Sequence, residues 1–255
     1  MSLSDFWYAV EHSVTLQDKP ISLTLLDQRY VLFRDSQGKP HALIDRCAHR
    51  GASLGEGWVD GDCIRCPYHG WSYNNQGTCV RIPADREGTP IPNRARMTPL
   101  PIQETNGFIW IFPGNTQLAD PALIPPFPEF GQEGWRPVHG EYTWNANFSR
   151  VVESGLDTSH APFVHKPFFP NRDDAVVHPL DVKVTDHHVS TYVQLKPPKR
   201  LGLLKYIIKK DRDYSSSVLT GYLPCINRIA IDFNWRGYQY IYFASNIPVS
   251  DNLTL

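Results

Sequence analysis

Four potential metal ligands gather in one short stretch of the chain. They come as two pairs, Cys47-x-His49 and Cys66-x-x-His69, with sixteen residues between His49 and Cys66. Each pair offers one thiolate and one imidazole from a tight loop. Such a set can hold a zinc ion tetrahedrally, or a [2Fe–2S] cluster in which two cysteines bind one iron and two histidines bind the other.

The residues around the two pairs favour the cluster over zinc. A C-x-H pair is not the usual spacing of a zinc finger, whereas a mixed-ligand cluster needs one sulfur and one nitrogen from each loop. Gly51 and Gly70 let the backbone pass close to a cluster, where N–H groups near the sulfurs tune its potential. Pro67 stiffens the second loop. A structural zinc protein is the alternative at this point.

The segments Cys47-Ala48-His49-Arg50-Gly51 and Cys66-Pro67-Tyr68-His69-Gly70-Trp71 resemble the Rieske signature of ring-hydroxylating oxygenases and related demethylases. Respiratory and photosynthetic Rieske proteins resemble it too, but they carry an extra cysteine in each loop, and the two form a disulfide. Ala52 and Tyr68 hold those places here, which indicates the oxygenase or ferredoxin branch. The [2Fe–2S] ligands that the resemblance implies are Cys47, His49, Cys66 and His69.

The composition is that of a folded protein without a strong charge. The chain has 255 residues, 41% of them hydrophobic and 12% aromatic, which suits one large or two modest domains with real cores. A formal net charge of −1 gives no basic field that would indicate nucleic acid. No targeting segment opens the chain and no run approaches the roughly 18 apolar residues of a membrane span. We predict a cytoplasmic protein, with a membrane tail or organelle targeting outside the given chain left open.

Three further cysteines, Cys63, Cys79 and Cys225, are interpreted as small buried apolar residues. Their odd number and the cluster-type spacing of the other two fit a reducing compartment rather than a disulfide scaffold.

Short strands and turns dominate the chain from Phe6 to about Phe112, which predicts an all-β first domain. Two predicted hairpins deliver the chain to Cys47 and to Cys66, so that both metal loops lie at hairpin tips. A nearly continuous apolar run, residues 108–112, suits a central strand. The predicted strands are residues 29–34, 41–44, 58–59, 63–65, 78–82 and 108–112.

Six prolines between Pro113 and Pro137 predict an ordered crossing or linker rather than sheet, because proline lacks an N–H and fixes φ. We place the domain boundary near it. The predicted domains are residues 1–118 and residues 119–255, the second incomplete at its C-terminus.

A second candidate metal site follows the linker. Helical spacing of apolar residues predicts a helix over residues 147–156. His160 and His165 come next; on an unbroken helix they would lie about 140° apart, but Pro162 disrupts the helix and can bring both imidazoles together. Two histidines and one carboxylate on one face of iron is the non-heme Fe(II) oxygenase arrangement. In isolation, the pattern fits a capping or surface His160 and a buried His165 better.

The motif Glu153-x-x-x-Asp157-x-x-His160-x-x-x-x-His165 resembles the mononuclear-iron motif of the same oxygenase family, and residues 156–163 are most similar to pheophorbide a oxygenase-like members. The resemblance implies that His160 and His165 ligate Fe(II). It implies that Asp157 hydrogen-bonds His160 and the cluster histidine of a neighbouring subunit, matched here by His69. Glu153 fits a helix-surface acid at least as well.

Alternating residues after the motif predict an antiparallel sheet. Such a sheet, curved over the helix predicted before it, matches the helix-grip catalytic domain of the family. We therefore expect an α+β fold overall. His187 and His188 lie at a predicted turn and are expected to be exposed rather than ligands. The family's third iron ligand is an acid further downstream, which neither Asp232 nor Asp251 matches. We therefore expect a truncated form of a longer protein, with that acid beyond Leu255. The predicted strands are residues 181–185, 189–195, 216–222, 228–233 and 238–244.

Seven basic residues lie between Lys196 and Arg212. They fit a surface helix with a solvated face, or a docking site for an acidic electron donor such as a ferredoxin. Phe163, Phe168 and Phe169 fit either a pocket for an apolar substrate or ordinary core packing.

The resemblance implies a terminal oxygenase. Electrons from NAD(P)H pass through a flavin reductase, with or without a ferredoxin, to the cluster and on to mononuclear Fe(II). There O2 is activated to hydroxylate, demethylate or ring-open an apolar or aromatic organic substrate. The family also implies a head-to-tail homotrimer. The alternative is a Rieske-type electron carrier without oxygenase activity of its own.

Overall fold

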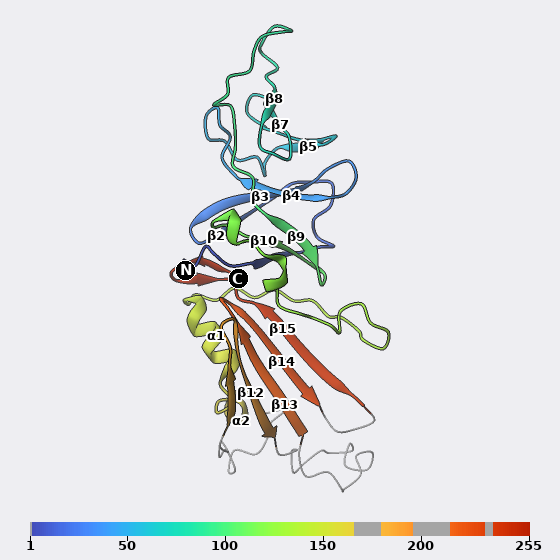
Figure 1. The fold of residues 1–255 in the computed structure, drawn as a ribbon, viewed down its shortest axis with the longest axis vertical. Helices are drawn as coiled ribbons and strands as arrows, with labels where there is room; N and C mark the ends of the chain where they lie inside the picture. Colours follow the sequence, from blue (N-terminus) through green and yellow to red (C-terminus); the bar gives the residue numbers. More distant parts are fainter. Residues whose placement is uncertain (1, 166–179, 196–214, 233–236) are drawn as a thin grey trace. The chain divides into compact units, whose positions relative to one another are not determined.

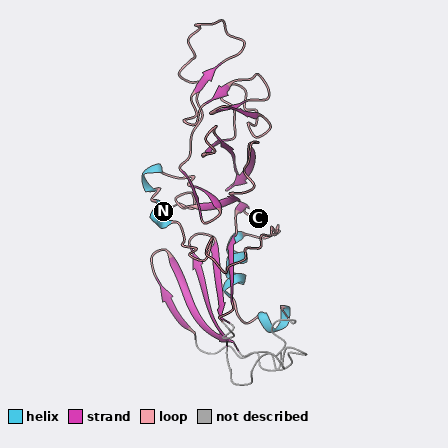
Figure 2. Cartoon of the chain, turned by 90° about the vertical axis from the view of Figure 1, so that its right-hand side faces the viewer, coloured by secondary structure: helices cyan, strands magenta, loops and turns pink. Residues whose placement is uncertain are grey.

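The structure, a computed structural model, describes residues 2–165, 180–195, 215–232 and 237–255 (Figure 1). The chain divides into two compact units, residues 1–145 with 247–255, and residues 146–246. Short antiparallel strands predominate and helices are few (Figure 2). The predicted α+β class, a β domain followed by an antiparallel-sheet domain with a helix, is confirmed. A compact unit need not fold alone, so the boundary predicted between residues 118 and 119 stays a prediction.

The first unit contains three small antiparallel sheets and a C-terminal hairpin. The apolar run at residues 108–112 forms β10, which lies in the middle of its sheet as predicted. One sheet has the order β1 (Tyr8–His12), β10 (Phe108–Ile111), β9 (Ile102–Thr105), and a second has β2 (Ile21–Leu25), β3 (Gln28–Arg34), β4 (Pro40–Ile44). The third has β5 (Trp58–Asp60), β6 (Cys63–Arg65), β7 (Ser72–Tyr73), β8 (Cys79–Arg81), and the hairpin is β16 (Pro248–Ser250) with β17 (Leu253–Thr254).

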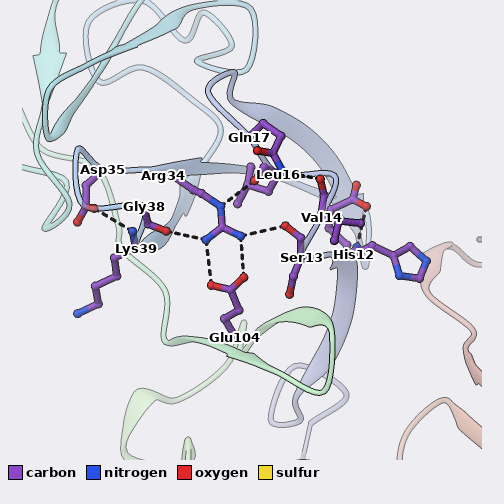
Figure 3. A network of polar contacts seen from close by, with 11 residues as sticks. His12, Ser13, Val14, Leu16, Gln17, Arg34, Asp35, Gly38, Lys39 and Glu104 are labelled. Carbon is purple, nitrogen blue, oxygen red and sulfur yellow. Dashed lines mark hydrogen bonds and ion pairs between the residues drawn. The ribbon is translucent and has the colours of Figure 1, made fainter. Parts of the chain in front are cut away.

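The guanidinium of Arg34 joins two of these sheets (Figure 3). Arg34 lies on β3, and both of its Nη atoms bind the carboxylate of Glu104 on β9, at 2.9 and 2.7 Å. The same guanidinium donates to the carbonyl oxygens of Leu16, Gly38 and Ser13 at 2.7, 2.6 and 2.9 Å. One side chain therefore ties the strand β3, its following turn and the segment after β1 to β9.

The two ligand loops follow strand ends in different ways. The loop from Cys66 to Trp71 lies at the tip of the β6–β7 hairpin, since Arg65 pairs with Ser72. The loop that contains Cys47 connects β4 to β5, and these strands belong to different sheets. The two predicted hairpins form, as β3–β4 and β5–β6, and each leads into a ligand loop. The prediction that both ligand loops lie at hairpin tips is right only for the second, at the tip of β6–β7, because the first loop connects two strands that do not pair with each other.

The proline-rich segment contains two 3-10 turns, η1 (Thr116–Leu118) and η2 (Pro121–Leu123), each capped by the side chain of the preceding residue. Residues 113–137, all of them described, contain no strand, which confirms the predicted crossing without sheet.

The second unit is a five-stranded sheet with a helix against it (Figure 1). The predicted helix is α1 (Phe148–Leu156), and the side chain of Asn147 caps it by accepting from the N–H of Ser149 at 3.0 Å. A short helix, α2 (Ala161–Val164), follows. The strands, in spatial order, are β11 (Asp181–Val184), β12 (His188–Leu195), β13 (Ser215–Tyr222), β14 (Ile226–Asp232) and β15 (Gln239–Ser245).

Some sequence predictions fall outside the described residues: the whole basic stretch from Lys196 to Arg212, Phe168 and Phe169, and the last residue of the strand predicted over 228–233. His187 is exposed as expected, but His188 is half-buried on β12 with its ring 5.3 Å from that of Tyr222. None of the helices in the described part of the chain has the length and apolar character needed to span a membrane.

Candidate cluster and iron sites

The two cysteine loops are closed by the same backbone hydrogen bonds. In each, the cysteine N–H donates to the carbonyl five residues later, and a glycine four residues after the cysteine donates back to its carbonyl. Gly51 and Gly70 have φ of 73° and 70°, a region that glycine adopts without strain. The donor–acceptor pairs are Cys47–Ala52 (2.9 Å), Gly51–Cys47 (2.8 Å), Cys66–Trp71 (2.9 Å) and Gly70–Cys66 (3.0 Å).

The loops place their cysteines side by side in the core. Cys47 is 3% exposed and Cys66 is 1% exposed. Burial raises the pKa of the Cys66 thiol, the backbone N–H groups of Tyr68 and His69 lower it, and the adjacent Cys47 raises it again. Backbone N–H groups aimed at a sulfur are the interactions that support a thiolate ligand.

The loops place their histidines side by side at the surface. His49 and His69 are exposed, with ring centroids 4.6 Å apart. Trp71 stacks on His49 at 4.6 Å with an interplanar angle of 4° and so fixes the orientation of that ring. Partial desolvation, then the charges of His69 and Arg50, lower the pKa of His49, which favours the neutral imidazole that binds metal.

This separation into a buried sulfur pair and an exposed nitrogen pair fits a two-iron cluster. A tetrahedral zinc ion needs four ligands directed at one point. Within the described ranges, no three His, Cys, Asp or Glu side chains converge as a single ion requires. A mixed [2Fe–2S] cluster needs two sulfurs on one iron and two nitrogens on the other, and the four residues present fit that demand.

The phenol of Tyr73 lies 3.1 Å from the Sγ of Cys47 and is fully buried. Burial, then the hydrogen bond with Cys47, raises the pKa of Tyr73, so the phenol stays protonated and can donate to a thiolate.

We expect Tyr73→Phe to lower the reduction potential of the cluster, since a hydrogen bond to sulfur stabilises the more negative, reduced state. A differential effect of about 1 kcal/mol corresponds to about 40 mV for one electron. Redox titration followed by EPR measures the shift. An unchanged potential with full cluster content would contradict the role of the phenol.

The candidate iron residues lie together after α1. The Nε2 atoms of His160 and His165 are 3.3 Å apart, and the short helix that starts after His160 includes Pro162. The two imidazoles are adjacent as predicted, but the predicted break at Pro162 is wrong: α2 runs through Pro162, and His160 and His165 flank it as its N-cap and C-cap residues. Two adjacent ring nitrogens of this kind suit a shared metal ion.

Asp157 is the C-cap residue of α1 and contacts His160 at Nδ1, the ring nitrogen that does not face His165. Its Oδ2 is 3.3 Å from Nδ1 of His160, and its Oδ1 accepts from the N–H and the hydroxyl of Ser159, both at 2.7 Å. These Ser159 hydrogen bonds, and to a lesser extent His160, lower the pKa of Asp157. An ionised Asp157 accepts the Nδ1–H of His160 and leaves the Nε2 lone pair free for metal.

Other acids do not complete this group. Glu153 is exposed and pairs with Arg150 at 2.6 Å, one turn along α1, which favours the surface interpretation. Across the described residues no carboxylate forms a three-membered metal group with His160 and His165. Asp232 lies at the end of β14, and Asp251 belongs to the other compact unit.

Of the three remaining cysteines, Cys79 and Cys225 are buried as expected, whereas Cys63 is partly exposed. Burial raises the pKa of Cys225 to about 12.

Models of two protein families match two separate parts of the chain. The Rieske [2Fe-2S] domain matches residues 6–101, and the vanillate O-demethylase oxygenase C-terminal domain matches residues 144–253. The two matches cover the cluster loops and the candidate iron residues in the order that the motifs predict. The chain combines a Rieske domain with a vanillate O-demethylase oxygenase C-terminal domain, and its homologues are Rieske oxygenases.

Individual Rieske oxygenases agree with this assignment. Chlorophyllide a oxygenase of Chlamydomonas reinhardtii is 36% identical over 66% of this chain and 25% of its own length. The oxygenase component of dicamba O-demethylase of Stenotrophomonas maltophilia is 34% identical over 63% of this chain and 47% of its own. The chain therefore spans less than half the length of these curated relatives.

A solved structure of dicamba monooxygenase with non-heme iron and dicamba has the same fold. It superposes with a TM-score of 0.81 at 23% identity, covering 99% of this chain and 75% of that one. At this identity the likeness establishes the fold.

Proposed function

We propose that this chain is the oxygenase component of a Rieske non-heme iron system that oxidises a small organic substrate with O2. The single observation that carries the proposal is the group Asp157–His160–His165 in a domain that follows a Rieske domain. A carrier needs only the cluster loops, whereas this group supplies two adjacent imidazoles and a carboxylate behind one of them. The Rieske cluster supplies electrons one at a time, and mononuclear Fe(II) supplies the place where O2 reacts.

Each candidate residue has a defined task. Cys47 and Cys66 bind one iron of the cluster, and His49 and His69 bind the other. His160 and His165 bind Fe(II) through Nε2. Asp157 accepts the Nδ1–H of His160, which fixes its tautomer and raises its basicity.

Partners and substrate class follow from the family. We infer that NAD(P)H supplies electrons through a flavin reductase, with or without a ferredoxin. A head-to-tail homotrimer lets His69 of one subunit approach Asp157 of the next. The relatives named for dicamba and toluene-4-sulfonate act on aromatic substrates, which supports an apolar or aromatic substrate. Hydroxylation, demethylation and ring opening are all open outcomes.

Two measurements test the proposal. The purified protein should be red-brown, give a Rieske EPR signal after reduction, and consume O2 in a substrate-dependent manner with a reductase and NAD(P)H. A stoichiometric cluster with no catalytic iron and no such O2 uptake across a panel of aromatic substrates would favour the electron carrier. A colourless protein that contains zinc would contradict both.

A further inference from the structure

The carboxylate of Asp45 is buried two residues before the first cluster ligand. It is 1% exposed. Its Oδ2 accepts from the hydroxyls of Ser22 and Ser53, both at 2.5 Å, and its Oδ1 accepts from the N–H groups of Leu54 and Gly55, the latter at 3.3 Å. All four partners donate, which suits an ionised carboxylate.

Three of these four partners lie on the far side of the ligand loop. Ser53, Leu54 and Gly55 follow the loop, so the side chain of Asp45 joins the residue that enters the loop to the residues that leave it. These hydrogen bonds close residues 45–55 into a ring, and Cys47 and His49 lie within it. The backbone bonds that close the loop itself, between Cys47 and the segment 51–52, lie inside the same ring.

The ring is anchored on both sides. Leu54 is fully buried in the core that also contains Cys47. Ser22 lies on β2, and a Cβ on Gly55 would come within 1.9 Å of the Ser22 hydroxyl oxygen, so the backbone passes directly over that serine. The hydroxyls of Ser22 and Ser53 are themselves 3.2 Å apart. Strand β2, the core and the loop exit therefore meet at one carboxylate.

We propose that Asp45 is a positioning residue for the cluster: its carboxylate holds the loop that carries Cys47 and His49, and its negative charge lowers the cluster potential. The second loop needs no such clamp, because the β6–β7 pairing closes it at its base. The first loop connects strands of different sheets and has no pairing of that kind, so a side chain takes over the task. The inference rests on the proposed [2Fe–2S] cluster but not on the oxygenase reaction.

Two substitutions separate the clamp from the charge. Asp45→Asn keeps an oxygen for the two N–H groups, and its amide can donate to the two hydroxyls, which rotate to accept. Asp45→Ala removes all four bonds. Asp18→Asn is the matched control, since Asp18 is an exposed aspartate of the same unit.

The readouts are the rate of cluster loss to a chelator, the EPR spectrum of the reduced protein and the midpoint potential. We expect Asp45→Ala to lose its cluster about tenfold faster than wild type. Asp45→Asn should keep the cluster but show an altered EPR spectrum and a higher potential, because a neutral side chain opposes the added electron less. Asp18→Asn should match wild type in all three.

Wild-type chelator rates, EPR spectra and potentials in both Asp45 variants would overturn the proposal. If Asp45→Ala does not fold, the Asn variant alone decides through its potential and spectrum. A wild-type protein that holds the cluster but oxidises no substrate would contradict the oxygenase function and leave the Asp45 series fully informative. A wild-type protein that cannot be loaded with a Rieske cluster would overturn both.

Discussion

Asp157→Asn is expected to reduce substrate-dependent O2 consumption by about 100-fold while the cluster remains reducible. An asparagine keeps one oxygen but loses the charge, and its NH2 group can face His160 as a donor. The imidazole then places its proton on Nε2, the atom that must bind metal. Steady-state O2 uptake measures the loss, and the EPR signal of the reduced protein measures the cluster.

Glu153→Gln is the control for this variant. It removes the same charge from the same helix, but Glu153 is exposed and its partner is Arg150, so we expect turnover within the error of wild type. Iron content distinguishes weak metal binding from slow electron transfer. Unimpaired turnover in Asp157→Asn would show that Asp157 has no role in electron transfer from the cluster to the mononuclear iron.

The two candidate metal groups were predictable because each is local in sequence. Backbone bonds that span four and five residues shape both cysteine loops, and Asp157 contacts His160 only three residues away. Such contacts depend on residue type and spacing, which a single sequence displays. The helix α1 was predictable for the same reason, since apolar periodicity and an Asn147 cap define it.

The contacts that hold these groups in place were not predictable, because they join distant residues. Asp45 reaches Ser22 across 23 positions, and Arg34 reaches Glu104 across 70. No local pattern distinguishes Asp45 from a surface aspartate before a loop. The hairpin error at the first loop has the same origin, since the partner of a strand is decided by the rest of the sheet rather than by the strand itself.

The return of the chain to the first unit is another long-range feature. After β15 the C-terminal hairpin β16–β17 joins the first unit, where the N–H of Leu26 donates to the carbonyl of Pro248 at 2.7 Å and Trp144 pairs with Thr254. A boundary assigned from the proline-rich segment alone places these last residues with the second domain. Spatial proximity, rather than order along the chain, decides their neighbours.

Arg34→Met is expected to destabilise the first unit by about 3 kcal/mol, with a fall of roughly 6–12 °C in its melting temperature. The substitution leaves the Glu104 carboxylate without its partner and removes the donor to the carbonyls of Leu16, Gly38 and Ser13. Partial exposure of Glu104 screens the ion pair, so most of the loss comes from the carbonyl groups. Thermal unfolding followed by the absorbance of the cluster reports on this unit.

Arg150→Met is the matched control, since Arg150 is 75% exposed and its bond to Glu153 within α1 contributes about 0.5 kcal/mol or less. Equal melting temperatures for the two variants would show that the Arg34 network does not stabilise the unit.

The stability of the first unit at acid pH provides a second test. The hydrogen bond from Arg34 lowers the pKa of Glu104 below its ordinary 4.5, so the ion pair stabilises the fold above that pH. Its contribution disappears only as the pH falls through the lowered pKa, and Arg34→Met should lack that part of the acid dependence.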